Sequence, residues 1–358
     1  MLSNYFQSQS ATTMKNNNRL NQLNQRINKN NKPPGNFKTN YAFKNGFFQN
    51  LNNLRVKNKD KDDIIDINPS IRCINYVYQA SFTNIQKTTG FGDFIRGCIY
   101  TLEFCEKHGI KYDFHIKNHN IQKHLNHFLN KPQISDIISL RVHKYLGLNS
   151  RFTCFSNKID YQIIHNSEND FISYVNSCPE YNGHVFINTT NFPLHHVSAS
   201  NLSAMAHLLK PTDVLNREID NYINSLQLSK KNFITYHIRL GDSFLCEGQE
   251  VIDKSHIQYI LDKINVNGEH NYFLITDSTI LKKIIINYFP GLKCIFFDIS
   301  HTCENNDSSI KNTLIEFYIM SCSKAIISFS VYPHGSGFSK WCSVVYNIPY
   351  TCYMLPKS

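Results

Sequence analysis

Six consecutive residues near the middle of the chain carry side chains suited to holding an anion. They read His237-Ile238-Arg239-Leu240-Gly241-Asp242, and they come where an apolar, β-rich run ends. Arg239 offers a planar fork of N–H donors that matches two phosphate oxygens, and Gly241 permits close backbone approach at a turn. Asp242 could hold the arginine or cap the loop. An arginine–aspartate ion pair at a strand end also occurs on surfaces that bind nothing, so local chemistry leaves both interpretations open.

A second anion-binding pattern lies further along the chain. Ser328-Phe329-Ser330 ends a β-rich run, and His334-Gly335-Ser336-Gly337-Phe338-Ser339-Lys340-Trp341 then opens a helical segment. Small and hydroxylic residues at a helix N-terminus leave backbone N–H groups and the positive end of the helix dipole open to an anion. Serine and glycine also cap helices that bind nothing.

Alternating strands and helices must position these residues. In the first half the expected elements are, in order, strand Tyr76–Tyr78, helix Phe94–His108, strand Tyr112–Ile116, a helix around Ile121–Leu129, a weakly patterned stretch to about Tyr174, and strand Val185–Asn188. In the second half the expected strands are Phe233–Ile238, Tyr272–Ile275, Cys294–Phe297 and Ala325–Phe329, and the expected helices are Ser255–Ile264, Ile280–Tyr288, Thr313–Ser323 and Phe338–Tyr346. This order predicts an α/β protein with parallel, Rossmann-like sheets. The predicted parts are a disordered basic tail (1–70), an N-terminal acceptor-side domain (71–228) and a C-terminal nucleotide-binding domain (229–358).

Taken together, the motifs resemble those of the fucosyltransferase superfamily, which comprises α1,2-, α1,6- and protein O-fucosyltransferases. His237–Asp242 resembles its H-x-R-x-G-D motif, and Ser336–Trp341 resembles its S-S-F-S-x-W/A motif. Phe273–Ser278 and Leu314–Ala325 resemble two further segments in the family's order. The resemblance covers about residues 230–346, roughly a third of the chain. Leu240 stands where the α1,2 and α1,6 branches usually carry a second arginine, so no branch is assigned.

The resemblance implies a GT-B fold, in which two Rossmann-like domains face a cleft and the C-terminal one holds a GDP-sugar without a metal. It implies that Arg239 binds the β-phosphate of the leaving GDP and that Glu316 pairs with guanine. His237 would lie near the nucleoside, with Gly241 in the same motif. The residues expected to form the phosphate-side wall are Ser336, Phe338 and Ser339.

The first half carries a looser match to the family, its N-terminal Gly-rich loop. Residues 88–97 read T-T-G-F-G-D-F-I-R-G. This is no dinucleotide fingerprint, because Ile95 stands where G-x-G-x-x-G requires glycine. In the functional interpretation Gly90, Gly92 and Arg96 contact the substrate, with Arg96 against the diphosphate, and Asp93 lies near the acceptor. A plain helix-starting turn is the alternative.

The expected reaction is inverting transfer of a sugar to an acceptor hydroxyl. Such a transfer needs a stabilised leaving group and often a base within reach of the acceptor. Arg239 would supply charge rather than a proton. Asp93, Asp242 and Glu247 are the candidates for the base, and the acceptor, a glycan or a protein, stays open.

Charge and composition restrict the other functions. The chain carries a net charge of +10, yet residues 1–59 contain ten basic and no acidic side chains, and the remainder is balanced at 27 of each. A folded face that binds nucleic acid is therefore not expected, although a basic arm in the tail could bind nucleic acid. No apolar window long enough for a membrane span and no export signal are found, and the 11 cysteines form no C-x-x-C pair, so we expect a cytoplasmic protein with reduced thiols.

Other chemistries lack their motifs. The only D-x-D, Asp60-Lys61-Asp62, lies in the polar tail, and no P-loop, H-E-x-x-H or G-x-S-x-G is present. We therefore predict a metal-independent glycosyltransferase that uses GDP-fucose or a related GDP-sugar as substrate and no other cofactor. The alternative is a catalytically inactive, transferase-like module that binds a glycan or a protein.

Overall fold

The computed structural model describes most of the chain after residue 64. The described residues are 65–79, 90–117, 119–131, 167–178, 180–187, 192, 197–241, 244, 251–266, 268, 270–297 and 306–356. They belong to one compact unit, Asp63–Ser358. The predicted tail therefore lies outside the described residues as far as residue 64, and the boundaries 71–228 and 229–358 remain predictions.

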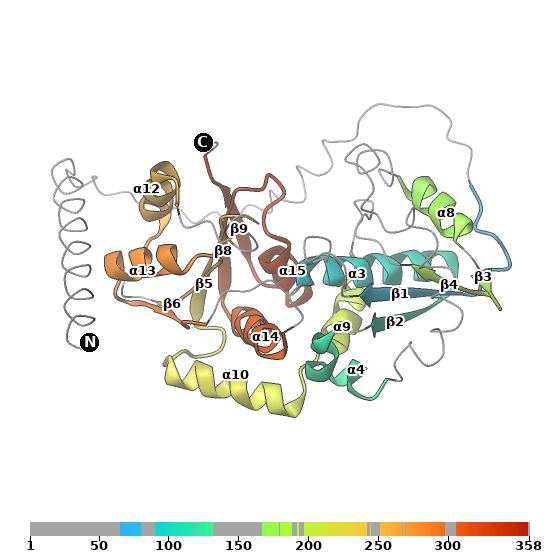
Figure 1. The fold of residues 1–358 in the computed structure, drawn as a ribbon, viewed down its shortest axis with the longest axis horizontal. Coiled ribbons are helices and arrows are strands. Elements are labelled where there is room, and N and C mark those ends of the chain that lie inside the picture. Colours follow the sequence, from blue (N-terminus) through green and yellow to red (C-terminus); the bar gives the residue numbers. More distant parts are fainter. Residues whose placement is uncertain are drawn as a thin grey trace, which may run out of the picture. The chain divides into compact units, whose positions relative to one another are not determined.

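The first sheet has the strand order β2-β1-β4-β3 (Figure 1). Strands β1 (Cys73–Gln79), β2 (Lys111–Lys117) and β4 (His184–Ile187) are parallel, and the short β3 (Glu180–Tyr181) pairs with β4 in the antiparallel sense. The three expected strands are present, each with slightly different ends.

Helix α3 (Phe91–His108) follows β1 and covers one face of this sheet. Alternate residues of a strand point to opposite faces, and the Tyr76 and Tyr78 rings lie on the face that meets the Phe94 ring of α3, with ring centroids 6.4 and 4.9 Å away. Gly109 ends the helix at φ 65°, a backbone conformation that glycine adopts without strain. The predicted strand and the helix that follows it are confirmed, with the helix starting three residues earlier than expected.

The prediction of one helix around residues 121–129 is wrong. The chain forms a 3₁₀ helix, η2 (Asn120–His124), then extends at Leu125, and only then forms the short α4 (Asn126–Leu129). Leu125 is extended because it bridges to Pro211, with backbone hydrogen bonds of 2.9 Å on both sides of the bridge. Three helices were not expected from the pattern: α8 (Glu168–Ser177), α9 (Ala199–Leu208) and α10 (Asp213–Ser225).

The second sheet is fully parallel and has the strand order β7-β6-β5-β8-β9. Its strands are β5 (Phe233–Arg239), β6 (Asn271–Thr276), β7 (Leu292–Cys294), β8 (Ala325–Ser330) and β9 (Tyr350–Met354). The helices between them are α12 (Lys254–Lys263), α13 (Thr279–Tyr288), α14 (Asp307–Ser321) and α15 (Gly337–Val345). The predicted β-α alternation is confirmed here, and β9 adds a strand that was not expected.

One predicted strand of this sheet is misplaced. The sequence favoured Cys294–Phe297, but β7 ends at Cys294, and the chain leaves the sheet there. Phe297 turns to pack on Tyr222 of α10, with ring centroids 5.3 Å apart, while Phe296 is 60% exposed. An apolar run therefore serves a helix contact and a surface position instead of the sheet.

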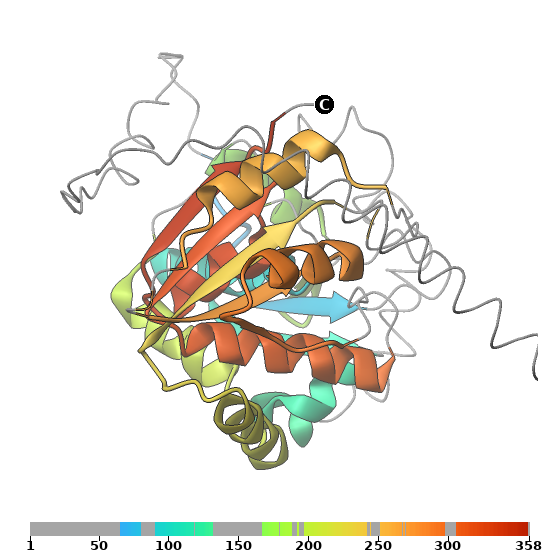
Figure 2. The same ribbon diagram turned by 90° about the vertical axis from the view of Figure 1, so that its left-hand side faces the viewer.

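The second sheet lies between two helical layers (Figure 2). Tyr236 and Ile238 pack with α12 and α13 in one hydrophobic cluster, whereas Phe233 packs in a larger cluster with α14 and α15. That larger cluster also contains the core of the first sheet, so both sheets share it. Within the described part of the chain, no helix is long and apolar enough to cross a membrane.

Candidate functional site

The N-termini of α3 and α15 meet at two glycines. A Cβ atom built on Gly92 would lie 2.4 Å from the backbone carbon of Gly337, which is closer than any real side chain is found. Figure 1 shows the start of α3 beside α15, and the larger hydrophobic cluster continues across this contact. The positive ends of two helix dipoles therefore lie together. The space that Gly92 leaves is filled by protein backbone, so its assignment to substrate binding stays a prediction.

These two helices also lack side-chain caps. The carbonyls of the N-cap residues Gly90 and Ser336 accept backbone hydrogen bonds, but neither residue caps its helix with a side chain. A side chain caps each of α8, α9, α10, α12, α13 and α14. An uncapped N-terminus leaves backbone N–H groups for a ligand, and an anion is the ligand that the dipole favours. Gly90 and Ser336 thus lie where the sequence predicted a substrate contact.

Basic side chains surround this junction. Arg96 projects from the first turns of α3 and forms an ion pair with Asp93 at 3.6 Å. Burial lowers the pKa of Lys340 on α15, and Arg96 lowers it further. His334 is also affected: burial lowers its pKa first, followed by Lys340 and Arg96. Lys340 and His334 were not predicted as site residues, although both stand in the motif region, and their basic character was the available signal.

The predicted phosphate arginine, Arg239, is held by Asp277, the residue that follows β6. Arg239 donates from Nη1 to Asp277 Oδ2 at 3.1 Å, and the same carboxylate accepts from the backbone N–H groups of Leu240 and Gly241. The Arg239 and Asp277 side chains are only 14% and 7% exposed, and burial raises the pKa of Asp277. Asp277 was not predicted as a site residue, and the role expected of Asp242 stays a prediction. Asp242 and Glu247 lie outside the described residues.

Gly241 adopts φ 122°, which only glycine accommodates easily. Its N–H donates to Asp277 Oδ2 at 3.1 Å, so this conformation helps to close the turn after β5. Glycine is therefore required at this position by the backbone.

His237 lies inside the same corner and is neutral. Its ring is 5.7 Å from the ring of Phe338, and its Nδ1 is buried without a hydrogen-bond partner. Burial lowers the pKa of His237 to about 3, with Arg239 contributing a smaller effect. Ser339 Oγ lies 3.2 Å from Ser328 Oγ in the core, so its hydroxyl already has a protein partner.

Glu316 lies on α14 beside a buried lysine of α13. Its carboxylate Oε1 is 3.7 Å from Lys282 Nζ, which is beyond hydrogen-bond distance, and this oxygen is buried without a hydrogen-bond partner. Burial raises the pKa of Glu316 to about 7 against the opposing effect of Lys282. Lys282 was missed because a single lysine in a helical pattern is normally solvent-facing.

Unsatisfied buried atoms coincide with the predicted site. Among the described residues, six buried side-chain nitrogen or oxygen atoms have no hydrogen-bond partner, and three of them belong to Arg96, His237 and Glu316. Buried polar groups are normally paired, and each exception calls for an explanation such as a ligand. These three residues are ones that the sequence assigned to the two ends of one nucleotide, while the other three atoms belong to Thr101, Thr235 and Tyr350.

The sheet register fixes the relation between those ends. Leu274 on β6 is paired with Tyr236 on β5 and with Cys294 on β7, so the end of β7 is level with Tyr236, one residue before His237. Two strand spacings correspond to about 10 Å. Lys282 donates to the carbonyl of Ile295, immediately after β7, so the Lys282–Glu316 pair lies near the end of β7.

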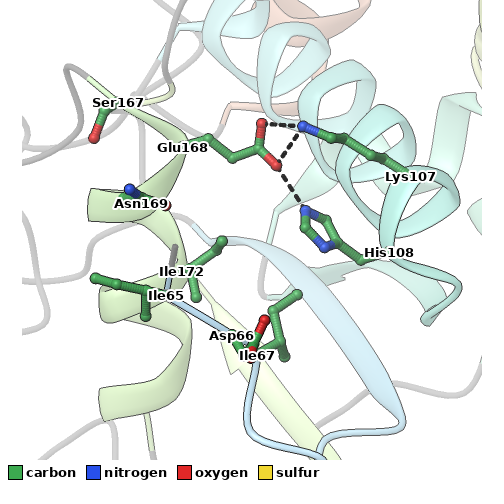
Figure 3. A pocket seen from close by; sticks show the side chains of 9 residues that line it. All are labelled: Ile65, Asp66, Ile67, Lys107, His108, Ser167, Glu168, Asn169 and Ile172. Carbon is green, nitrogen blue, oxygen red and sulfur yellow. Dashed lines mark hydrogen bonds and ion pairs between the residues drawn. The ribbon is translucent and has the colours of Figure 1, made fainter. Parts of the chain in front are cut away.

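A separate pocket at the far end of α3 does not share this chemistry (Figure 3). It measures about 380 Å³, and its wall includes Lys107 and His108, which end α3 about 24 Å from Gly92 by helical rise. Both contact Glu168, at 2.6 and 2.7 Å, so their charges are already compensated. Ser167 caps α8 there through a capping box. This pocket therefore lacks the open donors of the α3–α15 junction.

Comparison with known proteins gives a structural likeness but no sequence relative. No family model and no curated protein matches this chain. A variant of Arabidopsis thaliana FUT1 in complex with GDP is 10% identical with a TM-score of 0.50, over 82% of this chain and 73% of that one. Fucosyltransferase NodZ from Bradyrhizobium is 13% identical with a TM-score of 0.48, over 77% and 93%. POFUT1 in complex with GDP is 10% identical with a TM-score of 0.40, over 82% and 100%.

The likeness to FUT1 shows the fold. The chain has the two-sheet α/β architecture of a GT-B fucosyltransferase, as the motifs predicted. The individual site residues rest on the geometry of this chain alone.

Proposed function

We propose that this protein is a glycosyltransferase that moves a sugar from a GDP-sugar, with GDP-fucose as the first candidate, to an acceptor hydroxyl with inversion and without a metal. One observation carries this proposal. His237 Nδ1 and Glu316 Oε1 are buried without hydrogen-bond partners, and His237 lies beside Arg239 on β5 and contacts Phe338 at the start of α15, so a nucleoside diphosphate bound here would supply the missing partners. The fold, which is that of a fucosyltransferase, supports the proposal without assigning the substrate.

The phosphate end supplies most of the proposed catalysis. As the bond between sugar C1 and the β-phosphate oxygen breaks, negative charge grows on GDP, and Arg239 stabilises it from a fixed position on Asp277. The two uncapped helix N-termini and Arg96 add positive potential at the same place. Neutral His237 contributes a polar contact near the nucleoside and no charge.

The acceptor end needs a base. The acceptor oxygen forms the new bond to C1 from the face opposite GDP, and its proton passes to a carboxylate within reach. Asp93 is the proposed base in the described part of the chain, because it lies on α3 beside the junction and its side chain is 43% exposed. Its ion pair with Arg96 keeps it near the diphosphate without burying it.

The test is turnover of GDP-fucose by the full chain. Released GDP is measured with GDP-fucose, or with GDP-mannose, in the presence of a panel of glycan and peptide acceptors. We expect GDP release that depends on one acceptor class and falls by about 10³-fold in Arg239→Ala, as for other arginines that stabilise phosphate charge. Arg217→Ala, which removes an exposed arginine on α10, is the matched control.

Two results would contradict the proposal. Full activity in Arg239→Ala would show that the site is elsewhere. GDP-fucose binding without turnover across the whole panel would favour the inactive, transferase-like module instead.

A further inference from the structure

The end of β7 carries a buried pair of opposite charges that the phosphate chemistry does not use. Lys282 is 1% exposed, and its ammonium donates to the carbonyl of Ile295 at 2.8 Å. The same ammonium is 3.7 Å from Glu316 Oε1. A buried lysine is costly unless it is paired, so its retention at this place calls for a role.

No other cation compensates Glu316 in the described part of the chain. On α14 itself, Lys311 pairs with Glu218 of α10 at 3.2 Å, and Asp307 pairs with His124 of η2 at 3.2 Å. Within each pair the two partners compensate each other, so neither pair supplies a cation to Glu316.

The remaining neighbours of α14 point the same way. The pKa of Lys340 on α15 is lowered by burial and by Arg96, and Arg239 on β5 is paired with Asp277. The thiol of Cys294 on β7 faces the pair and has a pKa raised by burial. Lys282 is thus the charged side chain that stabilises the ionised form of Glu316.

The surroundings of the pair fit a planar base. Glu316 keeps 16% of its side chain exposed, and the Phe296 ring, 60% exposed, has its centroid 6.0 Å from Lys282 Nζ. An exposed aromatic ring stacks on any base, whatever its identity. The polar group that hydrogen-bonds to the edge of the base decides which base is preferred. An ionised carboxyl only accepts hydrogen bonds, but a protonated one donates one as well.

We infer that Lys282 is the positioning residue that keeps the Glu316 carboxyl ionised, so that this site prefers a base edge with two adjacent N–H donors, as in guanine, over the acceptor edge of adenine. This inference rests on the proposed function, because it concerns the base of the same nucleotide. Burial works against the ionised form and leaves the pKa of Glu316 at about 7 even with Lys282 present. Base selectivity is therefore predicted to change with pH.

The experiment is calorimetric titration of the full chain with GDP and with ADP between pH 6 and pH 9. Both ligands carry the same diphosphate, so protonation of the phosphates cancels in the ratio of their affinities. From a pKa of about 7, the ionised fraction of Glu316 rises from about 10% at pH 6 to about 90% at pH 8. The GDP-to-ADP affinity ratio should therefore rise about ninefold over that interval.

Lys282→Met tests the positioning role itself. A cation within 4–6 Å lowers the pKa of a carboxyl by about 1–3 units, so its loss should move the midpoint of the ratio upward by at least about one unit. At pH 7 the ratio should fall several-fold, and it should recover toward pH 9. A merely structural role would weaken both nucleotides equally and leave the midpoint where it is.

Two further variants keep the test decisive if a lone buried charge impairs folding. Glu316→Gln should give a low ratio that does not change with pH. The double variant Lys282→Met/Glu316→Gln removes both charges, and it should fold and show the same flat profile. The titration of the Glu316 carboxyl can also be followed without nucleotide, from the infrared difference between the wild type and Glu316→Gln. The corresponding difference between Lys282→Met and the double variant should show a higher titration midpoint.

The outcomes separate the two proposals. A wild-type ratio that is independent of pH, or an unchanged midpoint and infrared titration in Lys282→Met, would overturn the role of Lys282 while GDP binding still stood. No binding of either nucleotide by the wild type would overturn the proposed function, and this inference with it.

Discussion

The site contains two arginine–aspartate pairs of the same chemistry in opposite settings. Arg239 and Asp277 are 14% and 7% exposed and 3.1 Å apart, and the Asp277 carboxylate is also fixed by backbone donors. Arg96 and Asp93 are 30% and 43% exposed and 3.6 Å apart, within one helix. The buried pair joins two strands, whereas the exposed pair joins successive turns.

The difference in burial means that Arg239 has a fixed orientation, whereas Arg96 can change its orientation. A buried arginine held by an ion pair is already oriented before a ligand arrives, so little entropy is lost when it binds. The half-exposed pair is screened by solvent and can exchange partners at little cost. We therefore assign orientation of the diphosphate to Arg239, and additional attraction to Arg96.

The largest expected effect is the loss of Asp277. Asp277→Ala removes the buried carboxylate that accepts from the Arg239 guanidinium and from two backbone N–H groups. Breaking a buried pair in this way costs about 3–5 kcal/mol of stability. Asp93→Ala, at the exposed pair, should cost under about 1 kcal/mol. Denaturant unfolding gives the free energy of unfolding of both variants. Equal losses of stability would show that burial does not distinguish the two pairs.

Replacing each arginine by lysine tests geometry against charge. Arg239→Lys keeps the charge but loses the fork of donors, so GDP affinity should fall by about ten- to a hundredfold, the equivalent of one charge-assisted hydrogen bond. Arg96→Lys should change it only about two- to threefold, because an exposed charge needs no fixed orientation. Calorimetry with GDP checks both. A larger loss in Arg96→Lys would reverse the assignment of roles.

The helix contact beneath the exposed pair is more rigid than the pair itself. In Gly92→Ala the new methyl group would overlap the backbone of Gly337, so α3 and α15 must move apart. Overpacking of this kind costs about 1–3 kcal/mol. GDP affinity should fall as well, because both helix N-termini are displaced. Gly268→Ala, where an added Cβ meets nothing within 4 Å, is the control. Unchanged stability in Gly92→Ala would mean that the two helices are not in tight contact.

Salt gives the smallest expected effect. Raising the ionic strength shortens the screening length from about 10 Å at 0.1 M to about 3 Å at 1 M, which weakens exposed charges more than buried ones. GDP binding by the wild type should weaken a few-fold, and less so in Arg96→Ala. The dependence is measured by titration at several salt concentrations. An identical salt dependence in Arg96→Ala would exclude Arg96 from the attraction of the ligand.

The sequence predicted the parts of the site that local patterns determine. Arg239 at the end of β5 and Ser336 at the start of α15 follow from strand and turn chemistry, and the structure has them at those positions. The partner of Arg239 could not be read in the same way. Asp277 is 38 residues from Arg239 in the sequence, and the parallel pairing of β5 with β6 brings it to the turn.

Long-range contacts explain the other differences. Leu125 extends because Pro211 pairs with it, which no local helical pattern indicates. Lys282 is buried because the end of β7 and Glu316 of α14 meet its ammonium, although lysine in a helix normally faces solvent. Each of these features depends on residues distant in the sequence, and only the tertiary structure brings them together.

The most direct test of the central claim is calorimetric titration of the full chain with GDP and UDP in EDTA, for the wild type and Arg239→Ala. The account predicts micromolar GDP binding that persists in EDTA, exceeds UDP binding, and is lost in Arg239→Ala. Equal GDP affinity in the wild type and the variant, or no GDP binding by the wild type, would contradict it.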